Sequence, residues 1–275
     1  MDLSNESVIH IKKGNQEFLQ FRRLLKYENI ITHCYSLGIE KNYRTYKANK
    51  MQLPEKEFLK NTNNYKTLCE ANNLNYINII KAGQAHTDNV KIALKKINSN
   101  SPDFDGWENT DGLITNKENI ILATTNADCI LLLFFDPIKK VIANAHSGWK
   151  GTLKEISVKT VKKMVEEFGC NPKDIIVCIA PSIRKCHFEV SEDVYELFYN
   201  QFKKLRSIES FITEKNGKWY IDTVKINKII LKQVGILEEN IEDSEICSVC
   251  NKNIVHSYRA EGENYGLATC LISLK

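Results

Sequence analysis

The chain has 275 residues, of which 43% are hydrophobic and 26% are charged, a balance that supports a packed core and excludes wholesale disorder. Its 38 Lys and Arg residues against 34 Asp and Glu residues give a net charge of +4. That charge is too small for a dedicated nucleic-acid binder, and only six of the cations are Arg, the residue that makes most base-specific contacts. We therefore expect no nucleic-acid partner.

The predicted elements of the first half are short apolar strands. They are expected at residues 76–81, 113–115, 120–125, 130–135 and 141–145. The run at 130–135 is apolar at every position, which predicts a strand buried on both faces. Residues 61–78 are rich in Asn and are interpreted as a polar surface stretch, and His10 is placed in a frayed N-terminal segment.

After Thr152 the apolar residues recur every three or four positions until Gly169, which predicts a helix ending at a glycine C-cap. Later elements are expected as strands at 175–180, 254–258 and 268–274 and as helices at 192–202 and 224–234. The alternation predicts an α+β fold, a layered sandwich of mixed β-sheets flanked by helices.

Nothing in the sequence suggests export, a membrane or several domains. The central apolar run of six residues falls far short of the roughly 18 that span a bilayer, and Met1 to Glu6 lack the features of a secretory leader. Nine scattered Cys residues fit a reducing compartment. We expect a cytoplasmic protein with one domain over residues 1–275, and the sequence leaves its oligomeric state open.

Three residues with metal-binding or nucleophilic side chains stand at the ends of predicted strands: His86, Cys129 and His146. Strand ends hold side chains rigidly while leaving them open to a cleft. Two imidazoles and one thiolate suit Zn²⁺, and three protein ligands leave a fourth position for water or substrate. The same residues also permit a metal-free Cys–His pair with Cys129 as nucleophile, or simple packing of a buried thiol.

Two further groups of Cys and His residues are interpreted as packing residues. Cys247 and Cys250 form an isolated CxxC motif, whereas a zinc ribbon needs a second pair. Cys186 and His187 are adjacent, and neighbours on a regular strand point to opposite faces. The prediction is that they do not bind one metal ion together.

Several sequence blocks occur together in a characteristic order. They are Gln84-Ala85-His86, Asp111-Gly112-Leu113-Ile114-Thr115, Ala127-Asp128-Cys129, His146-Ser147-Gly148-Trp149-Lys150-Gly151-Thr152, Pro181-Ser182-Ile183 and Ser257-Tyr258-Arg259. In these blocks the chain resembles the YfiH family, known as the laccase-domain or polyphenol oxidase family and described as purine nucleoside phosphorylases. The resemblance covers about residues 30–275.

The resemblance implies a CNF/YfiH-like fold, also found in proteins classed as cysteine hydrolases. It implies that His86, Cys129 and His146 bind Zn²⁺ and carry the catalysis. The implied reactions are phosphorolysis of adenosine to adenine and ribose 1-phosphate, deamination of adenosine, and phosphorolysis of methylthioadenosine, so the partners are a purine nucleoside and phosphate. Asp128, beside the implied ligand Cys129, is a candidate to orient one of the two His residues.

Some residues depart from the family pattern and keep other functions open. No Arg follows the His33–Gly38 segment closely, and Leu267 stands where an Arg is common, which weakens the case for phosphate binding. Arg44, Arg184 and Arg259 are the candidate replacements. The alternatives are a peptidoglycan-precursor editing hydrolase, a copper-dependent polyphenol oxidase and a binding protein without activity. Copper is the weaker choice because the chain has six His residues and the triad only two.

Overall fold

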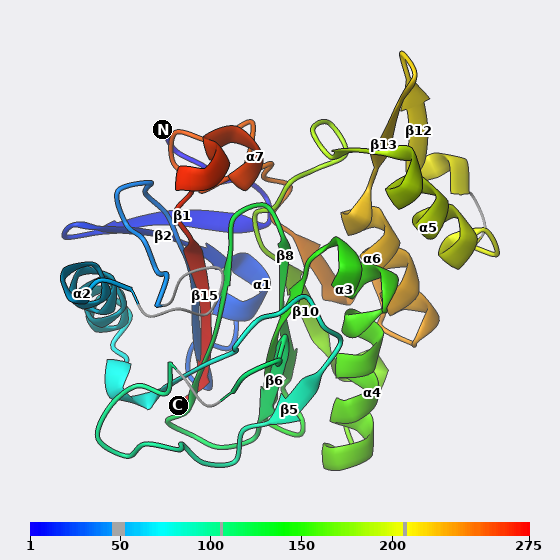
Figure 1. Ribbon diagram of the computed structural model, residues 1–275. Helices are drawn as coiled ribbons and strands as arrows, with labels where there is room; N and C mark the ends of the chain where they lie inside the picture. Colours follow the sequence, from blue (N-terminus) through cyan, green and yellow to red (C-terminus); the bar gives the residue numbers. More distant parts are fainter. Residues whose placement is uncertain (46–52, 105–106, 206–207) are drawn as a thin grey trace.

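The computed structural model describes residues 1–45, 53–104, 107–205 and 208–275, and within these residues the strands form two large sheets and one small sheet (Figure 1). The first sheet contains, in spatial order, β1 (Val8–Lys13), β2 (Gln16–Phe21), β3 (Ile31–Ser36), β15 (Ala268–Leu274), β7 (Ile121–Asn126) and β4 (Ile79–Lys81). The second contains β14 (Ile241–Asp243), β10 (Ile176–Ile179), β8 (Ile130–Asp136), β9 (Val141–Ser147), β6 (Gly112–Thr115) and β5 (Val90–Ile92). The small sheet contains β11 (Glu189–Val190), β13 (Lys218–Ile221) and β12 (Ile212–Lys215).

Both large sheets are mixed. In the first, β15 pairs antiparallel with β3 and β7, whereas β4 is parallel to β7. In the second, β8 is antiparallel to β9 and β10, and β5 is parallel to β6. The predicted layered α+β sandwich of mixed sheets is confirmed.

Strand β8 shows why a continuous apolar run is needed at the centre of the molecule. Leu131 and Leu133 belong to the core between the two large sheets. Leu132 and Phe134 point to the opposite face, into the core beneath the helices. Because side chains alternate along a strand, both faces of β8 are covered, as the sequence predicts.

Helices form the outer layers. The described helices are α1 (Arg22–Leu25), α2 (Glu55–Ala71), α3 (Trp149–Leu153), α4 (Ile156–Phe168), α5 (Glu192–Phe202), α6 (Thr223–Gln233) and α7 (Tyr258–Glu261). Figure 1 shows α2 on the outer side of the first sheet and α4 and α6 beyond the second. Tyr65 of α2 packs in one cluster with Ile121 of β7, and Val161 of α4 packs in another with Phe134 of β8. None of the described helices is both long and apolar enough to cross a membrane.

Four local predictions are wrong. Residues 254–258 are not a strand, because the Ser257 side chain accepts from the Ala260 N–H and caps α7. The helix expected after Thr152 is split at Glu155, whose φ is 56°. The N-terminal segment is the ordered hairpin of β1 and β2, and residues 61–71 of the Asn-rich stretch belong to α2, in which Asn61 is buried.

Candidate metal centre

The pairing of the strands brings His86, Cys129 and His146 to one point. Parallel pairing of β4 with β7 places the loop after β4, which carries His86, beside the β7–β8 loop, which carries Cys129. His146 is near the end of β9, and one ligand atom from each of the three residues lies within 4.8 Å of the others. The structure therefore gathers all three residues that the strand-end pattern selects.

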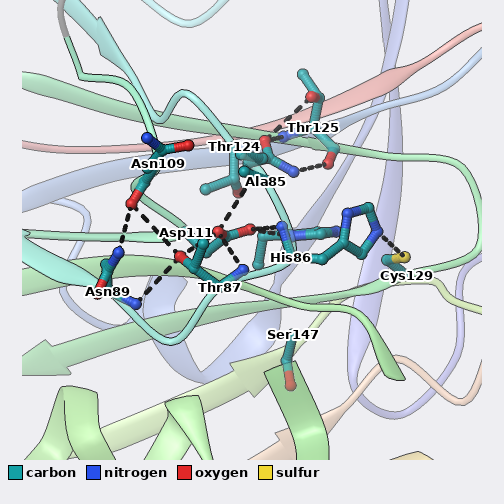
Figure 2. A network of polar contacts seen from close by, with 12 residues as sticks. Ala85, His86, Thr87, Asn89, Asn109, Asp111, Thr124, Thr125, Cys129 and Ser147 are labelled. Carbon is teal, nitrogen blue, oxygen red and sulfur yellow. Dashed lines mark hydrogen bonds and ion pairs between the residues drawn. The ribbon is translucent and has the colours of Figure 1, made fainter. Parts of the chain in front are cut away.

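His86 is held in an uncommon backbone conformation by Asp111 (Figure 2). Its φ is 58°, in the left-handed region, which costs a non-glycine residue about 1 kcal/mol or more. The carboxylate of Asp111 accepts from the backbone N–H groups of Ala85 at 3.1 Å, His86 at 3.1 Å and Thr87 at 2.7 Å, and from the Thr87 hydroxyl at 2.6 Å. These bonds fix the loop so that His86 Nε2 lies 3.8 Å from Cys129 Sγ.

Asp111 also orients His146. Antiparallel pairing of β6 with β9 sets Gly112 opposite Ala145, and His146 Nδ1 lies 2.8 Å from Asp111 Oδ1. With Nδ1–H donating to the carboxylate, Nε2 is left with a free lone pair for a metal. Asp111 is fully buried, and although its desolvation acts the other way, the hydrogen bonds from His146 and Thr87 lower its pKa to about 2.

Charge at the centre favours a thiolate and an imidazolium when no metal is bound. Burial of the Cys129 thiol by itself raises its pKa, but the charge of His146 and the hydrogen bonds from both His residues lower the pKa to about 6. Conversely, burial lowers the pKa of His146, yet the nearby Cys129 and Asp111 raise it to about 9. Cys129 is therefore ionised at neutral pH, the form that binds metals.

Gly148 leaves room for these ligands. A Cβ atom at this position would lie 2.7 Å from His86 Cδ2 and 3.2 Å from Cys129 Sγ. Since van der Waals contact requires about 3.5 Å or more, no residue larger than glycine fits here without displacing a ligand.

Asp128 plays a different part from the one expected. It orients neither His residue; its carboxylate accepts from the hydroxyls of Ser248 at 2.5 Å and Ser257 at 2.7 Å and from the Arg259 backbone N–H at 2.7 Å. Asp128 thus joins the Cys129 loop to the segment around α7, whereas Asp111 binds the His146 imidazole and the His86 backbone N–H. The sequence separation of 35 residues between Asp111 and His146 gave no local signal of their contact.

The donor set fits a tetrahedral zinc ion with one open position. Ligands at the usual Zn–S and Zn–N distances would stand about 3.6 Å apart across a tetrahedral angle, close to the 3.8 Å between Cys129 Sγ and His86 Nε2. His86 is solvent-exposed and Cys129 half-buried, so the centre is open on one side. An open position on a three-ligand site is typical of catalytic zinc.

The remaining His residues lie elsewhere. His33 Nε2 accepts from the Phe21 N–H at 2.7 Å, His10 pairs with Glu17 at 3.0 Å, and His256 Nε2 lies 2.8 Å from the Lys41 carbonyl oxygen. By contrast, Cys186, His187, Cys247 and Cys250 form a second cluster, with one ligand atom of each within 4.8 Å of the others. The strand geometry expected for Cys186 and His187 is therefore wrong. Cys186 and His187 stand on a turn, where the alternation of a strand does not apply.

The fold and the centre define a mixed α+β sandwich protein with an open cluster of three candidate metal ligands. A family model described as multi-copper polyphenol oxidoreductase laccase matches residues 56–275. The chain belongs to this family, as its resemblance to YfiH proteins implies.

Relatives and solved structures agree with this assignment. The chain is 35% identical over 173 residues to the mouse purine nucleoside phosphorylase LACC1, covering 61% of this chain and 39% of that protein. It is 33% identical over 168 residues to purine nucleoside phosphorylase YlmD of Bacillus subtilis, covering 60% of this chain and 59% of that protein. The matches thus span less than two thirds of these relatives' lengths. The crystal structure of Bacillus licheniformis YfiH superposes with a TM-score of 0.83 at 24% identity, covering 97% of this chain and 99% of that one.

Proposed function

We propose that this protein is a zinc-dependent purine nucleoside phosphorylase. In the proposed reaction it converts adenosine and phosphate to adenine and ribose 1-phosphate; it also deaminates adenosine and cleaves methylthioadenosine. The observation that carries the proposal is the convergence of His86, Cys129 and His146 within 4.8 Å, with His86 open to solvent. Similarity to proteins named purine nucleoside phosphorylase, and at 31% identity to one named adenosine deaminase RL5, supports the substrate class.

The protein's own groups prepare the centre for this chemistry. Zinc at the three ligands would supply Lewis-acid polarisation and activation of water at neutral pH. Asp111 holds the proton on His146 Nδ1 and fixes the ring, and the same carboxylate fixes the backbone of His86. Because one buried carboxylate holds the His146 ring and the His86 backbone, both ligands are positioned before substrate arrives, so that reorganisation during the reaction is small.

Phosphate would be held by an Arg that forms no ion pair with a carboxylate among the described residues. Arg184 is excluded as a phosphate ligand, since its guanidinium forms a bidentate salt bridge with the Asp243 carboxylate at 2.9 and 2.6 Å. Arg259 donates instead to the carbonyl oxygens of His187 at 2.9 Å and Glu189 at 3.0 Å. Its backbone N–H binds Asp128, so the Arg259 backbone adjoins the loop that carries Cys129. We therefore assign Arg259 to phosphate.

Arg44 is the second candidate cation. Its guanidinium lies 4.3 Å from the centroid of the Tyr265 ring and donates to the Tyr265 carbonyl oxygen at 2.9 Å. Tyr265 is two residues before Leu267, where the resemblance leads one to expect an Arg. Arg44 therefore supplies a positive charge close to that position from another part of the chain.

The proposed reaction is tested by chromatography of adenosine incubated with zinc-loaded protein, with and without phosphate. Adenine that forms only with phosphate is expected from the wild type, and neither adenine nor inosine from Cys129→Ala. Arg259→Gln should raise the KM for phosphate at least about tenfold, as expected when a charge-assisted hydrogen bond is lost, and leave deamination unchanged. Full activity of Cys129→Ala would refute the proposed centre.

Copper-dependent oxidation of phenols is the second candidate, favoured by the donor set itself. Two His and one Cys also form the trigonal ligand set of blue-copper sites. In that case the copper-loaded protein should oxidise a phenol and the zinc-loaded protein should leave adenosine intact. Adenosine turnover by zinc-loaded, copper-free protein would exclude it as the main function.

A further inference from the structure

A second cluster of metal-binding side chains lies away from the candidate metal centre. It comprises Cys186, His187, Cys247 and Cys250, with one ligand atom from each residue within 4.8 Å of the others. All three cysteines are free thiols, and neither Asp111 nor any of the three residues of the first centre takes part. We propose that this cluster is a structural Zn²⁺ site with three Cys ligands and one His ligand.

Most of the separations are close to those that tetrahedral zinc requires. At Zn–S of about 2.3 Å and Zn–N of about 2.0–2.1 Å, two sulfur ligands stand about 3.8 Å apart and a sulfur and a nitrogen about 3.6 Å apart. Cys186 Sγ lies 3.6 Å from Cys247 Sγ and 4.0 Å from Cys250 Sγ. His187 Nδ1 lies 3.2 Å from the sulfur of Cys186 and 3.6 Å from each of the other two sulfurs. These separations are far larger than the roughly 2.05 Å of a disulfide.

The local backbone explains how adjacent residues can bind one ion. The N–H groups of His187 and Phe188 both donate to the Arg184 carbonyl oxygen at 2.9 Å, which closes a turn. On this turn the side chains of Cys186 and His187 face the same point. The other two ligands lie on a second turn, closed by the Asn251 N–H bond to the Cys247 carbonyl oxygen at 3.1 Å. Two turns with a C-x₂-C spacing in one of them are typical of structural zinc sites.

The two turns belong to segments about 60 residues apart, and the backbone already pairs them beside the cluster. The Ser182 backbone N–H donates to the Ile246 carbonyl oxygen at 3.2 Å, and the Ser248 backbone N–H donates to the Ser182 carbonyl oxygen at 3.0 Å. Four protein ligands close the coordination shell, so the ion has no open position for substrate. Its role is to join the two segments, because the free energy of metal binding adds to the free energy of folding.

The second site also supports the first. Ser248, between Cys247 and Cys250, donates its hydroxyl hydrogen to Asp128, the neighbour of Cys129. Arg259 donates to the carbonyl oxygen of His187, itself a ligand of the second site. Zinc at the second site thus fixes the groups that position Asp128 and Arg259, although it does not touch the first centre.

The experiment measures zinc content and ligand type in the full chain, purified under reducing conditions from zinc-containing medium. Wild-type protein should hold two zinc ions per chain, with an average of two sulfur ligands per zinc by X-ray absorption. Cys129→Ala, which lacks only the sulfur ligand of the first centre, should retain one zinc ion. Its absorption spectrum should show about three sulfur ligands at roughly 2.3 Å and one nitrogen.

Variants of the second site provide the matched comparison. Cys250→Ser changes a solvent-exposed thiol and should reduce zinc from two ions to one while lowering the melting temperature. Cys170→Ala also removes a thiol, from a residue outside both clusters, and should keep both ions. This comparison is independent of the proposed enzymatic function, because zinc in Cys129→Ala reports the second site alone.

Three results would overturn the proposal. They are one zinc ion per wild-type chain with a single sulfur ligand, a folded Cys129→Ala protein that holds no zinc, and a disulfide among Cys186, Cys247 and Cys250 found by mass spectrometry of protein purified with reductant. The first and third are measured on wild-type protein, so they decide the matter even where a variant does not fold.

Discussion

Replacement of Gly148 by Ala tests whether the spacing of the ligands governs metal binding. The new Cβ would stand 2.7 Å from His86 Cδ2 and 3.2 Å from Cys129 Sγ. Carbon atoms in contact lie about 3.5 Å apart or more, so the His86 ring must move by roughly 0.8 Å. The backbone adds no strain of its own, because the φ of Gly148 is −63°, which alanine adopts readily.

A shift of this size is large for a metal site. Zinc–ligand distances hold within about 0.2 Å, and a misplacement of about 1 Å at an active site can reduce the rate about 100-fold. We therefore expect Gly148→Ala to weaken zinc binding at the first centre at least about tenfold, comparable with the loss of a group that orients a ligand. The proposed phosphorolysis should fall about 100-fold.

Gly151→Ala is the matched control. A Cβ at Gly151 meets Ile156 Cγ2 at 3.4 Å and nothing closer, which is ordinary contact. Because Gly151 lies within helix α3, alanine there should raise the free energy of unfolding by about 0.5–1 kcal/mol and keep zinc affinity unchanged. Zinc affinity is measured by competition with a chromophoric chelator, and stability by urea denaturation. Wild-type zinc affinity in Gly148→Ala would refute the proposed control of metal binding by ligand spacing.

Three other predictions concern buried polar groups and the metal. Asp111→Asn should weaken zinc binding about 10–100-fold and lower the free energy of unfolding by about 3–5 kcal/mol, as breaking a buried ion pair does. Asp136→Asn is the control: Asp136 is also buried but accepts from the Ile138 and Lys139 N–H groups of an exposed turn, so zinc affinity should stay unchanged. Equal zinc affinities of the two variants in a competition assay would contradict this. Burial lowers the pKa of His33 to about 3 from 6.5, so the folded state binds fewer protons than the unfolded state below pH 6.5. The free energy of unfolding should therefore fall as the pH drops below about 6.5, by up to 1.4 kcal/mol per pH unit. His33→Gln should show a shallower dependence on pH in denaturation experiments, and an unchanged slope would exclude His33 as the cause. Removing zinc with a chelator should lower the melting temperature, and adding zinc should restore it; a melting temperature insensitive to both treatments would mean that no stabilising metal is bound.

The sequence selects the three residues that the structure brings together, because two of them follow strong local patterns. Cys129 and His146 adjoin apolar runs long enough to be recognised as buried strands, and these runs are β8 and β9. The hydrophobic pattern of the sequence does not show which strands pair with one another. Asp111 reaches His146 only because β6 lies antiparallel to β9, and a contact across 35 residues leaves no periodicity in the sequence.

The second cluster was missed for a related reason. The adjacency of Cys186 and His187 predicts opposite faces of a strand, but the two residues lie on a turn that contains neither Gly nor Pro to mark it. Their partners Cys247 and Cys250 are about 60 residues further along the chain, so the two halves of the site meet only in the folded protein. Likewise, helix α2 in the Asn-rich stretch depends on burial of polar side chains, such as Asn61, whose amide donates to the Arg44 carbonyl oxygen at 2.8 Å. Composition alone does not predict such a contact.

The measurement that tests the proposed function most directly is phosphorus NMR of zinc-loaded protein incubated with adenosine and inorganic phosphate. The centre formed by His86, Cys129 and His146 should convert phosphate to ribose 1-phosphate in amounts equal to the adenine released. The Cys129→Ala protein should leave the phosphate signal unchanged. An unchanged phosphate signal with the wild type, from folded protein whose zinc content has been verified, would contradict phosphorolysis as the function of this centre.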